Sequence, residues 1–350
     1  MLSECVSEGV GEGVSKGGNV SDTSGNSNAS GNVSASGSGE CVSEGVNILA
    51  QLTEDGRTAL MISAFEGNID ILRIIQKYAP SLTQSLTSTL HINAVDTHGN
   101  TALHHCCFGG SVECGQYLVS ECGADPFQRN SEGMLPIHFA AAGNHTSLVR
   151  YLHQLSTSSV CECVSKGEGK CSGECKMSVG EGGSESSSGD NTIATATATS
   201  DSGINTLHRA AMHGSLETLQ LLINEQLTAV NSTTLNMNTA LHLASQRGML
   251  NIVDFLLTHS VTQASEGVGV EVDVNAQNQY GLSPLHFACI GGYSGVVKCL
   301  LQHGAVPTLC SASGATPLHL ASSAGSHECC ELLVKSKHTV DLWAEDSDGE

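Results

Sequence analysis

One short phrase recurs seven times along this 350-residue chain, and its spacing limits what the chain can fold into. The phrase usually begins with a hydroxyl residue, continues with a small residue or proline and then an aliphatic residue, and ends in six copies with histidine. The seven aliphatic positions are Leu60, Leu103, Ile137, Leu207, Leu241, Leu285 and Leu318. Three of the intervals are 33 or 34 residues long, and the others are that unit plus an insertion. A fixed period of this length predicts a stack of similar modules, each too small to bury its own apolar face.

Each unit carries the signals that begin and end a helix. Thr101 and Thr239 are typical N-cap residues, and Pro284 suits the first helical position, where a missing N–H costs nothing. About nine residues later comes a glycine such as Gly110, suited to the left-handed conformation that ends a helix. A second apolar pattern with the period of a helix then follows. The unit therefore predicts two helices and a turn, in which glycines such as Gly281 return the chain to the next copy.

The period and the phrase Thr-Pro-Leu-His-x-Ala together resemble the ankyrin repeat, over roughly residues 47 to 350. The resemblance implies an all-α curved solenoid of helix-turn-helix units with short β-turn or hairpin loops. It also implies that His104 and its equivalents brace the turn by hydrogen bonds to the backbone and to the capping hydroxyl. In such a solenoid the turn tips and the ends of the first helices form a concave groove.

The copies differ in how well they match the repeat at the capping, turn and histidine positions. Copy three has Leu135 at the capping position, and the loss of a cap costs about 1 kcal/mol. Copy four has Asn205 there, which caps well. Copy five has Met237 where the turn glycine belongs, which predicts a turn that is strained or differently shaped. Copy one has Met61 in place of histidine, as expected of an atypical terminal repeat.

Composition divides the chain into five parts. Residues 1–46 are rich in Ser and Gly and nearly free of large apolar side chains, which predicts disorder, and residues 157–202 have the same character. The repeats then occupy 47–156 (copies one to three) and 203–345 (copies four to seven). All long gaps fall between a second helix and the next turn, so we expect one continuous stack. Residues 346–350 read as the start of an eighth copy, so a fragment or a truncated protein is expected.

Charge and hydropathy disfavour several classes of function. The formal net charge of −21 disfavours nonspecific binding to nucleic acid or anionic lipid. The chain has no run of about 18 apolar residues, which predicts no membrane insertion, and no secretory signal pattern. Its 15 cysteines, without such a signal, predict an intracellular protein with free thiols, in either cytoplasm or nucleus.

Two clusters invite a metal or catalytic interpretation. The cysteines at 161, 163, 171 and 175 offer thiolates for zinc, but their spacing is unlike that of common zinc sites, and disordered sequence expansion is the simpler explanation. In His104-His105-Cys106-Cys107, the register makes His104 the repeat histidine and the cysteines replacements for small buried residues. The sequence contains no nucleophile elbow, phosphate-binding loop or metalloprotease helix, so we assign no catalytic, cofactor or metal residues.

The register also gives candidate partner-binding residues. Four residues near the ends of first helices are apolar where packing does not require it, which favours a contact surface unless neighbouring residues cover them. Gln246 lies in the same column as those four, a histidine and an arginine lie in the next column, and one aromatic residue lies at a turn tip. The predicted binding residues are Phe65, Phe108, Met212, His213, Gln246, Arg247, Tyr280 and Ile290.

Three hypotheses on function follow. The first is a noncatalytic adaptor or scaffold, in which the concave groove of the implied ankyrin-repeat stack holds a protein partner. In the second, the array is the recognition arm of a larger palmitoyltransferase, ubiquitin ligase, kinase or cation channel, because ankyrin arrays accompany such proteins. The third is a metal or redox sensor that uses the cysteines between residues 161 and 175. The fold alone does not name the partner.

Overall fold

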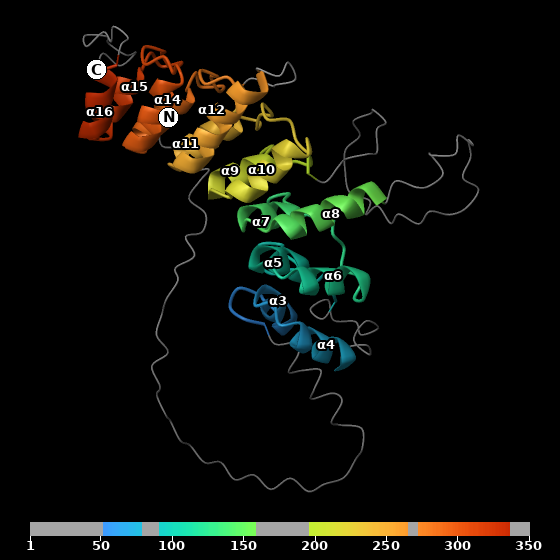
Figure 1. Ribbon diagram of the computed structural model, residues 1–350. Helices are drawn as coiled ribbons and strands as arrows, with labels where there is room; N and C mark the ends of the chain where they lie inside the picture. Colours follow the sequence, from blue (N-terminus) through green and yellow to red (C-terminus); the bar gives the residue numbers. More distant parts are fainter. Residues whose placement is uncertain (1–51, 79–90, 159–195, 265–271, 337–350) are drawn as a thin grey trace, which may run out of the picture. The chain divides into compact units, whose positions relative to one another are not determined.

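The computed structural model describes residues 52–78, 91–158, 196–264 and 272–336 (Figure 1). The expected disordered segment 1–46, residues 159–195 of the insertion 157–202 and the residues 346–350 lie outside this part of the chain. Residues 196–202, at the end of that insertion, are described and include the buried Ala196 and Ala198, so the expected disorder does not extend to them. The described residues form fourteen helices and one isolated antiparallel bridge between Thr233 and Thr239, with no strand among them. The predicted all-α fold class is confirmed.

The helices alternate as the repeat predicts, one pair for each copy of the phrase. The first helices are α3 (Ala59–Phe65), α5 (Ala102–Gly109), α7 (Pro136–Ala142), α9 (Thr206–His213), α11 (Ala240–Gln246), α13 (Pro284–Ile290) and α15 (Pro317–Ser323). The second helices are α4 (Ile69–Tyr78), α6 (Val112–Ser120), α8 (Thr146–Ser158), α10 (Leu216–Asn224), α12 (Leu250–Ala264), α14 (Ser294–Gln302) and α16 (His327–Val334).

The pairs stack in chain order. Each first helix packs against the next first helix, from α3 through to α15, and each second helix packs against the next second helix (Figure 1). The same contacts join α7 to α9 and α8 to α10, the helices on either side of the long insertion. The described residues therefore form one continuous stack within the unit Ser43–Glu350, as expected.

The aliphatic residue of the phrase forms the centre of the core. In copies two to six this residue, for example Leu103 or Leu241, is at most 1% exposed. Leu60 and Leu318 in the first and last copies are only partly buried, because a neighbouring unit covers them on one side alone. Cys106, Cys107 and Cys289 are fully buried, as expected for cysteines that replace small core residues.

The repeat histidine connects each unit to the next. In copies two to six its Nδ1 accepts the backbone N–H of the cap residue at 2.9–3.2 Å. Its Nε2–H donates to a backbone carbonyl of the following unit at 2.9–3.2 Å. The donors and acceptors are His104 and Met134, His138 and Ala198, His208 and Ser232, His242 and Leu282, and His286 and Ala315. Burial lowers the pKa of each of these histidines to about 4, so the neutral ring is the form present at pH 7.

The implied bracing role of the histidine is therefore confirmed, and the structure adds the bond to the following unit. Even copy three, which lacks a capping hydroxyl, keeps the bond from the Leu135 N–H to His138 Nδ1, at 2.9 Å. Leu135 is itself buried in the apolar core. Its burial offsets the missing cap, because burying a leucine is worth about 2 kcal/mol and a cap about 1 kcal/mol.

The turn of copy five keeps the shape of the others. Met237 has φ 60°, close to the φ of 70–80° at the glycines of the other turns, and its N–H donates to the Thr234 carbonyl at 2.9 Å. Gly281 makes the equivalent bond to Asn278, also at 2.9 Å. Of the two alternatives for this turn, the different shape is wrong, and Met237 adopts a left-handed conformation that methionine disfavours.

Candidate interaction surface

A ladder of backbone hydrogen bonds holds the turn tips of all seven units in line. In each step, a backbone N–H at one tip donates to a carbonyl at the preceding tip, at 2.8–3.2 Å. The donors and acceptors are Thr97 and Asp55, Ser131 and His98, Asp201 and Glu132, Leu235 and Ser202, Gln279 and Asn236, and Ala312 and Tyr280. The tips thus form one ordered edge, which holds the side chains at fixed spacing.

Large apolar side chains are exposed at the tips of copies five and six. Leu235 is 70% exposed, Met237 53% and Tyr280 43%. Tyr280 was predicted to lie at a tip, and it does. The other two follow from the same register, although apolar character there is not required by packing.

At the ends of the first helices, the structure brings two predicted aromatic residues together. The rings of Phe65 (α3) and Phe108 (α5) stack, with centroids 6.1 Å apart and planes 17° from parallel, and both residues are partly buried. The next residue, Gly109, permits this approach, because a Cβ there would lie 1.9 Å from the Phe65 carbonyl oxygen. Ile290, at the end of α13, is partly exposed and packs against the core.

Met212 differs from the other predicted apolar residues. It is 7% exposed, so the expectation that it would be an exposed apolar group is wrong. Its helix α9 packs against α7 on one side and α11 on the other, and such close packing covers the side chain. Whether Met212 contributes to binding stays a prediction.

The predicted polar residues lie near a cation that the sequence analysis did not select. His213 and Arg247 are exposed at the ends of α9 and α11, and Gln246 is partly buried. Arg209 precedes His213 by one helical turn, with its guanidinium carbon 5.9 Å from the ring centroid of Phe139. Partial burial, followed by the positive charges of Arg209 and Arg247, lowers the pKa of His213 to about 4, so its ring is neutral at pH 7. The i,i+4 spacing of Arg209 and His213 was the signal available in the sequence.

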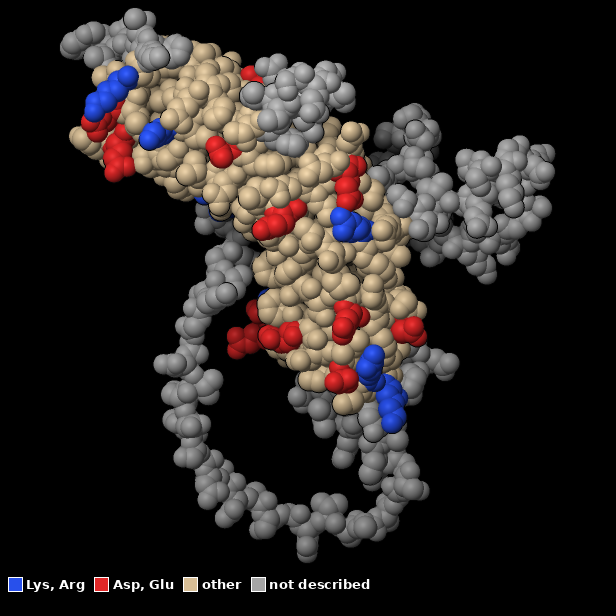
Figure 2. Space-filling model, viewed as in Figure 1, with Lys and Arg blue, Asp and Glu red and all other residues tan. Residues whose placement is uncertain are grey.

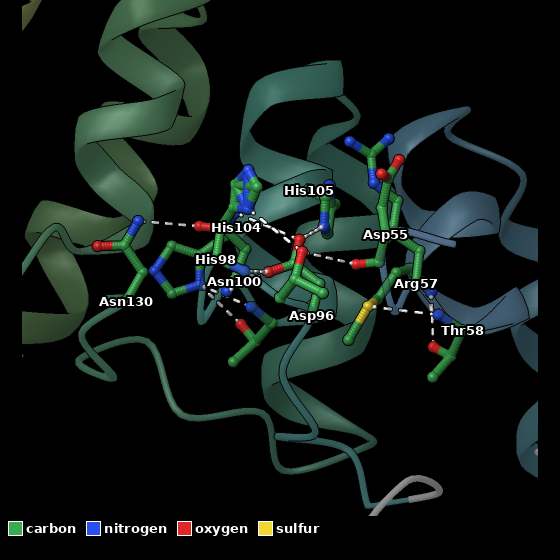
Figure 3. A network of polar contacts seen from close by, with 12 residues as sticks. Asp55, Arg57, Thr58, Asp96, His98, Asn100, His104, His105 and Asn130 are labelled. Atoms are coloured by element: carbon green, nitrogen blue, oxygen red, sulfur yellow. Dashed lines mark hydrogen bonds and ion pairs between the residues drawn. The ribbon is translucent and has the colours of Figure 1, made fainter. Parts of the chain in front are cut away.

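A buried polar network fixes the turn of copy two (Figure 3). The Asp96 carboxylate accepts from His105 Nε2 at 2.9 Å and from the backbone N–H groups of His98 and Asn100 at 2.9 and 2.8 Å. Burial alone would raise the pKa of Asp96, but these hydrogen bonds and the adjacent His105 ring hold it well below its usual range. Asn130 of the next turn donates to Asn100 at 2.9 Å. The network braces turns rather than presenting a reactive group.

The described residues contain few groups of side chains that could bind a metal ion or act in catalysis. No group of three His, Cys, Asp or Glu residues there is placed to hold a metal ion. Burial raises the pKa of the Cys106 thiol to about 12 and raises that of Cys107 as well, so both stay protonated. The four cysteines between residues 161 and 175 lie outside the described residues. Within the same ranges, no helix combines the length and apolar character that crossing a bilayer requires.

The charged side chains lie scattered over the face shown in Figure 2, with broad uncharged areas between them. Several pair locally, for example Arg150 with Glu225 at 2.6 Å. That pair joins α8 to α10 and so adds a polar contact between copies three and four.

Comparison with known proteins identifies the fold family. The family model for ankyrin repeats (three copies) matches residues 25–130, 76–162, 187–266 and 263–346. The crystal structure of the human ASB11 ankyrin repeat domain aligns with 81% of this chain and 100% of that chain, with a TM-score of 0.53 and 18% identity, which shows similarity of fold.

The curated relatives share only parts of their length with this chain. The human transient receptor potential cation channel subfamily A member 1 is 30% identical over 136 residues, which is 39% of this chain and 11% of the channel. The ankyrin repeat protein YahD of Escherichia coli (strain K12) is 38% identical over 96 residues, 26% of this chain and 43% of YahD. Human BCL-6 corepressor-like protein 1 is 32% identical over 123 residues, 35% of this chain and 6% of that protein. Together with the seven stacked helix pairs, the family match shows that this chain belongs to the ankyrin-repeat family.

Proposed function

We propose that the repeat array is an adaptor or scaffold that binds a protein partner along the turn tips and the ends of the first helices. Ankyrin repeats are protein-interaction modules, and the residues predicted for binding recur at equivalent positions of successive units. The observation that carries the proposal is the placement of partly exposed apolar groups, Phe65, Phe108 and Ile290, at those helix ends. Their burial in a complex would stabilise it by roughly 25 cal/mol for each Å² covered.

The experiment compares two double variants in affinity capture with the full chain as bait. Phe108→Ala with Ile290→Ala removes apolar groups from the proposed surface. Ile74→Ala with Val334→Ala removes apolar groups that are 56% and 50% exposed on second helices. We expect the first pair to abolish capture and the second to leave it intact, with both variants folded by circular dichroism. Equal capture by both variants would remove this surface from the proposal.

A second candidate is that the array serves as the recognition arm of a larger protein. The observation that favours it is the small share of the relatives that the chain matches, 11% of the human channel and 6% of the corepressor-like protein. The same surface would then act within one polypeptide. Sequencing the transcript beyond the codon for Glu350 tests this candidate, which predicts a membrane-spanning or catalytic segment in the same reading frame.

A further inference from the structure

Charge is distributed unevenly along the repeat array. The tips of copies one to four carry the acidic residues Asp55, Glu132 and Asp201, whereas the tip residues 234–238, 278–282 and 311–315 of copies five to seven have no charged side chain. On the first helices, the two arginines Arg209, within α9, and Arg247, directly after α11, belong to copies four and five. The local charge there is positive, although the chain as a whole carries −21.

These two arginines and His213 come from two adjacent elements. Arg209 and His213 lie one turn apart on α9, and Arg247 follows the end of α11, which packs against α9. His213 and Arg247 occupy equivalent positions of their units, and both are exposed. The positive charges of Arg209 and Arg247 both lower the pKa of His213, so its ring lies near both arginines and is neutral at pH 7.

Exposed apolar residues lie at the other end of α11 from Arg247. Leu235 and Met237 precede α11 in the same unit, and Tyr280 lies at the adjacent tip, where the Gln279 N–H bonds the Asn236 carbonyl at 3.1 Å. A helix of seven residues, such as α11, is about 10 Å long, so one extended ligand can reach both the tip and the helix end of copy five. Ile290 adds a partly exposed apolar group in copy six.

We propose that copies four to six form a binding site for an acidic peptide segment that also carries apolar side chains. Its carboxylates would lie against Arg209 and Arg247, with the neutral His213 ring as a neighbouring hydrogen-bonding group, and its apolar groups against Leu235, Met237 and Tyr280. Such a segment would contact the first helix of copy four and not its tip, because Asp201 there would repel it, as would Asp55 and Glu132 at the tips of copies one and three. This inference rests on the proposed function and names the chemistry of the partner.

The range of electrostatic forces permits a local site on an acidic protein. At an ionic strength of about 0.15 M the Debye length is about 8 Å, so distant acidic residues are largely screened while the adjacent cations still act. The site spans three units at about 10 Å each, which corresponds to about eight to ten residues of extended peptide.

The test measures fluorescence anisotropy of labelled peptides with the full chain at about 0.15 M salt. The acidic probe, about ten residues long, alternates Glu with Leu. One matched probe has Gln for each Glu, another has Ser for each Leu, and a single-stranded oligonucleotide serves as a fourth. We expect the acidic apolar probe to bind most tightly. Arg209→Gln with Arg247→Gln should weaken it about tenfold, while Lys298→Gln, an exposed cation on the second helix α14, should not.

Two further variants keep the result interpretable if the double variant is unstable. Arg247→Glu alone should weaken the acidic probe more than the Gln probe. Leu235→Ser should reduce binding of the Leu probe and leave the Ser probe unchanged. Equal binding of the acidic and Gln probes, an equal effect of Lys298→Gln, or tighter binding of the oligonucleotide would each overturn the acidic-peptide site. If the acidic probe fails while Phe108→Ala with Ile290→Ala still abolishes capture, the proposed function survives and only the partner chemistry is wrong.

Discussion

At the scale of single residues, buried histidine is the group that this array repeats most consistently. In each of copies two to six, the ring joins the cap of its own unit to a carbonyl of the next. Only the neutral ring with its proton on Nε2 can make both bonds at once, because Nδ1 must then accept while Nε2–H donates. Protonation would add a second N–H donor at Nδ1, directly facing the N–H of the cap residue.

This arrangement makes stability depend on pH. The folded-state pKa of about 4 lies below the ordinary histidine value of 6.5, so the unfolded state binds more protons between these pH values. Stability is therefore fully present above about pH 6.5 and falls as the pH decreases towards 4. We expect a loss of about 1–2 kcal/mol for each of the five histidines between pH 7 and 5, partly offset as the chain loses negative charge.

Urea denaturation at a series of pH values measures this effect. The variant His242→Gln should be less stable than the parent at pH 7, because the bonds to Thr239 and Leu282 are lost. It should also show a shallower decline of the free energy of unfolding between pH 7 and 5. An identical slope in parent and variant would mean that His242 does not titrate as its burial implies.

Met237 is a second residue whose backbone conformation leads to a prediction. Its φ of 60° lies in the left-handed region, which costs a non-glycine residue roughly 1 kcal/mol. Met237→Gly should therefore raise the free energy of unfolding by about that amount, because the 53% exposed side chain loses little burial. Met237→Ala serves as the control and should give no such gain. A Gly variant that is no more stable than the Ala variant would contradict the assignment of strain to this turn.

At the scale of elements, one helix is capped by the unit before it. The cap residue of α10, Ser215, donates its hydroxyl to the Ala142 carbonyl at 3.0 Å instead of capping its own helix. Asn144 from copy three supplies the cap, because its Oδ1 accepts the Thr218 N–H at 3.0 Å. Its amide also contacts the Glu217 carboxylate. Asn144 itself has φ 62° directly after the C-cap of α7, so one residue both ends a helix of its own unit and caps a helix of the next.

Substitutions at Asn144 separate these two roles. Asn144→Gly keeps the left-handed backbone and removes the cap, and should cost about 1 kcal/mol of stability. Asn144→Ala removes both and should cost about 2 kcal/mol. Chemical denaturation of the two variants and the parent gives the comparison. Equal stability of the Gly variant and the parent would mean that the Thr218 N–H needs no partner from copy three.

The sequence predicted the helices well because their signals are local. The cap residue, the proline at the first position and the closing glycine act within one turn of helix, and each recurs in register. Contacts between units are harder to predict from the sequence. The cap from Asn144 to Thr218 spans 74 residues across the insertion, so no local signal indicates it. Met212 shows the same limit, because register placed it correctly but could not show how closely α7 and α11 cover it.

At the scale of the whole array, the insertion between copies three and four interrupts the chain but not the packing of the units. The α7–α9 and α8–α10 contacts, the His138 bond and the Asn144 cap all cross this junction. Loop closure contributes little to stability, since each halving of loop length gains only about 0.6 kcal/mol. Continuity therefore depends on the helix contacts and not on the covalent connection.

Cleavage within the insertion tests this continuity most directly. A specific protease site placed between residues 159 and 195 of the full chain would be cut in the folded protein, followed by size-exclusion chromatography under native conditions. The continuous stack predicts that the two fragments elute together and separate only in denaturant. Asn144→Ala should weaken their association, whereas Lys298→Gln, away from the junction, should not. Separation of the two fragments under native conditions would contradict the continuous array on which the proposed binding surface depends.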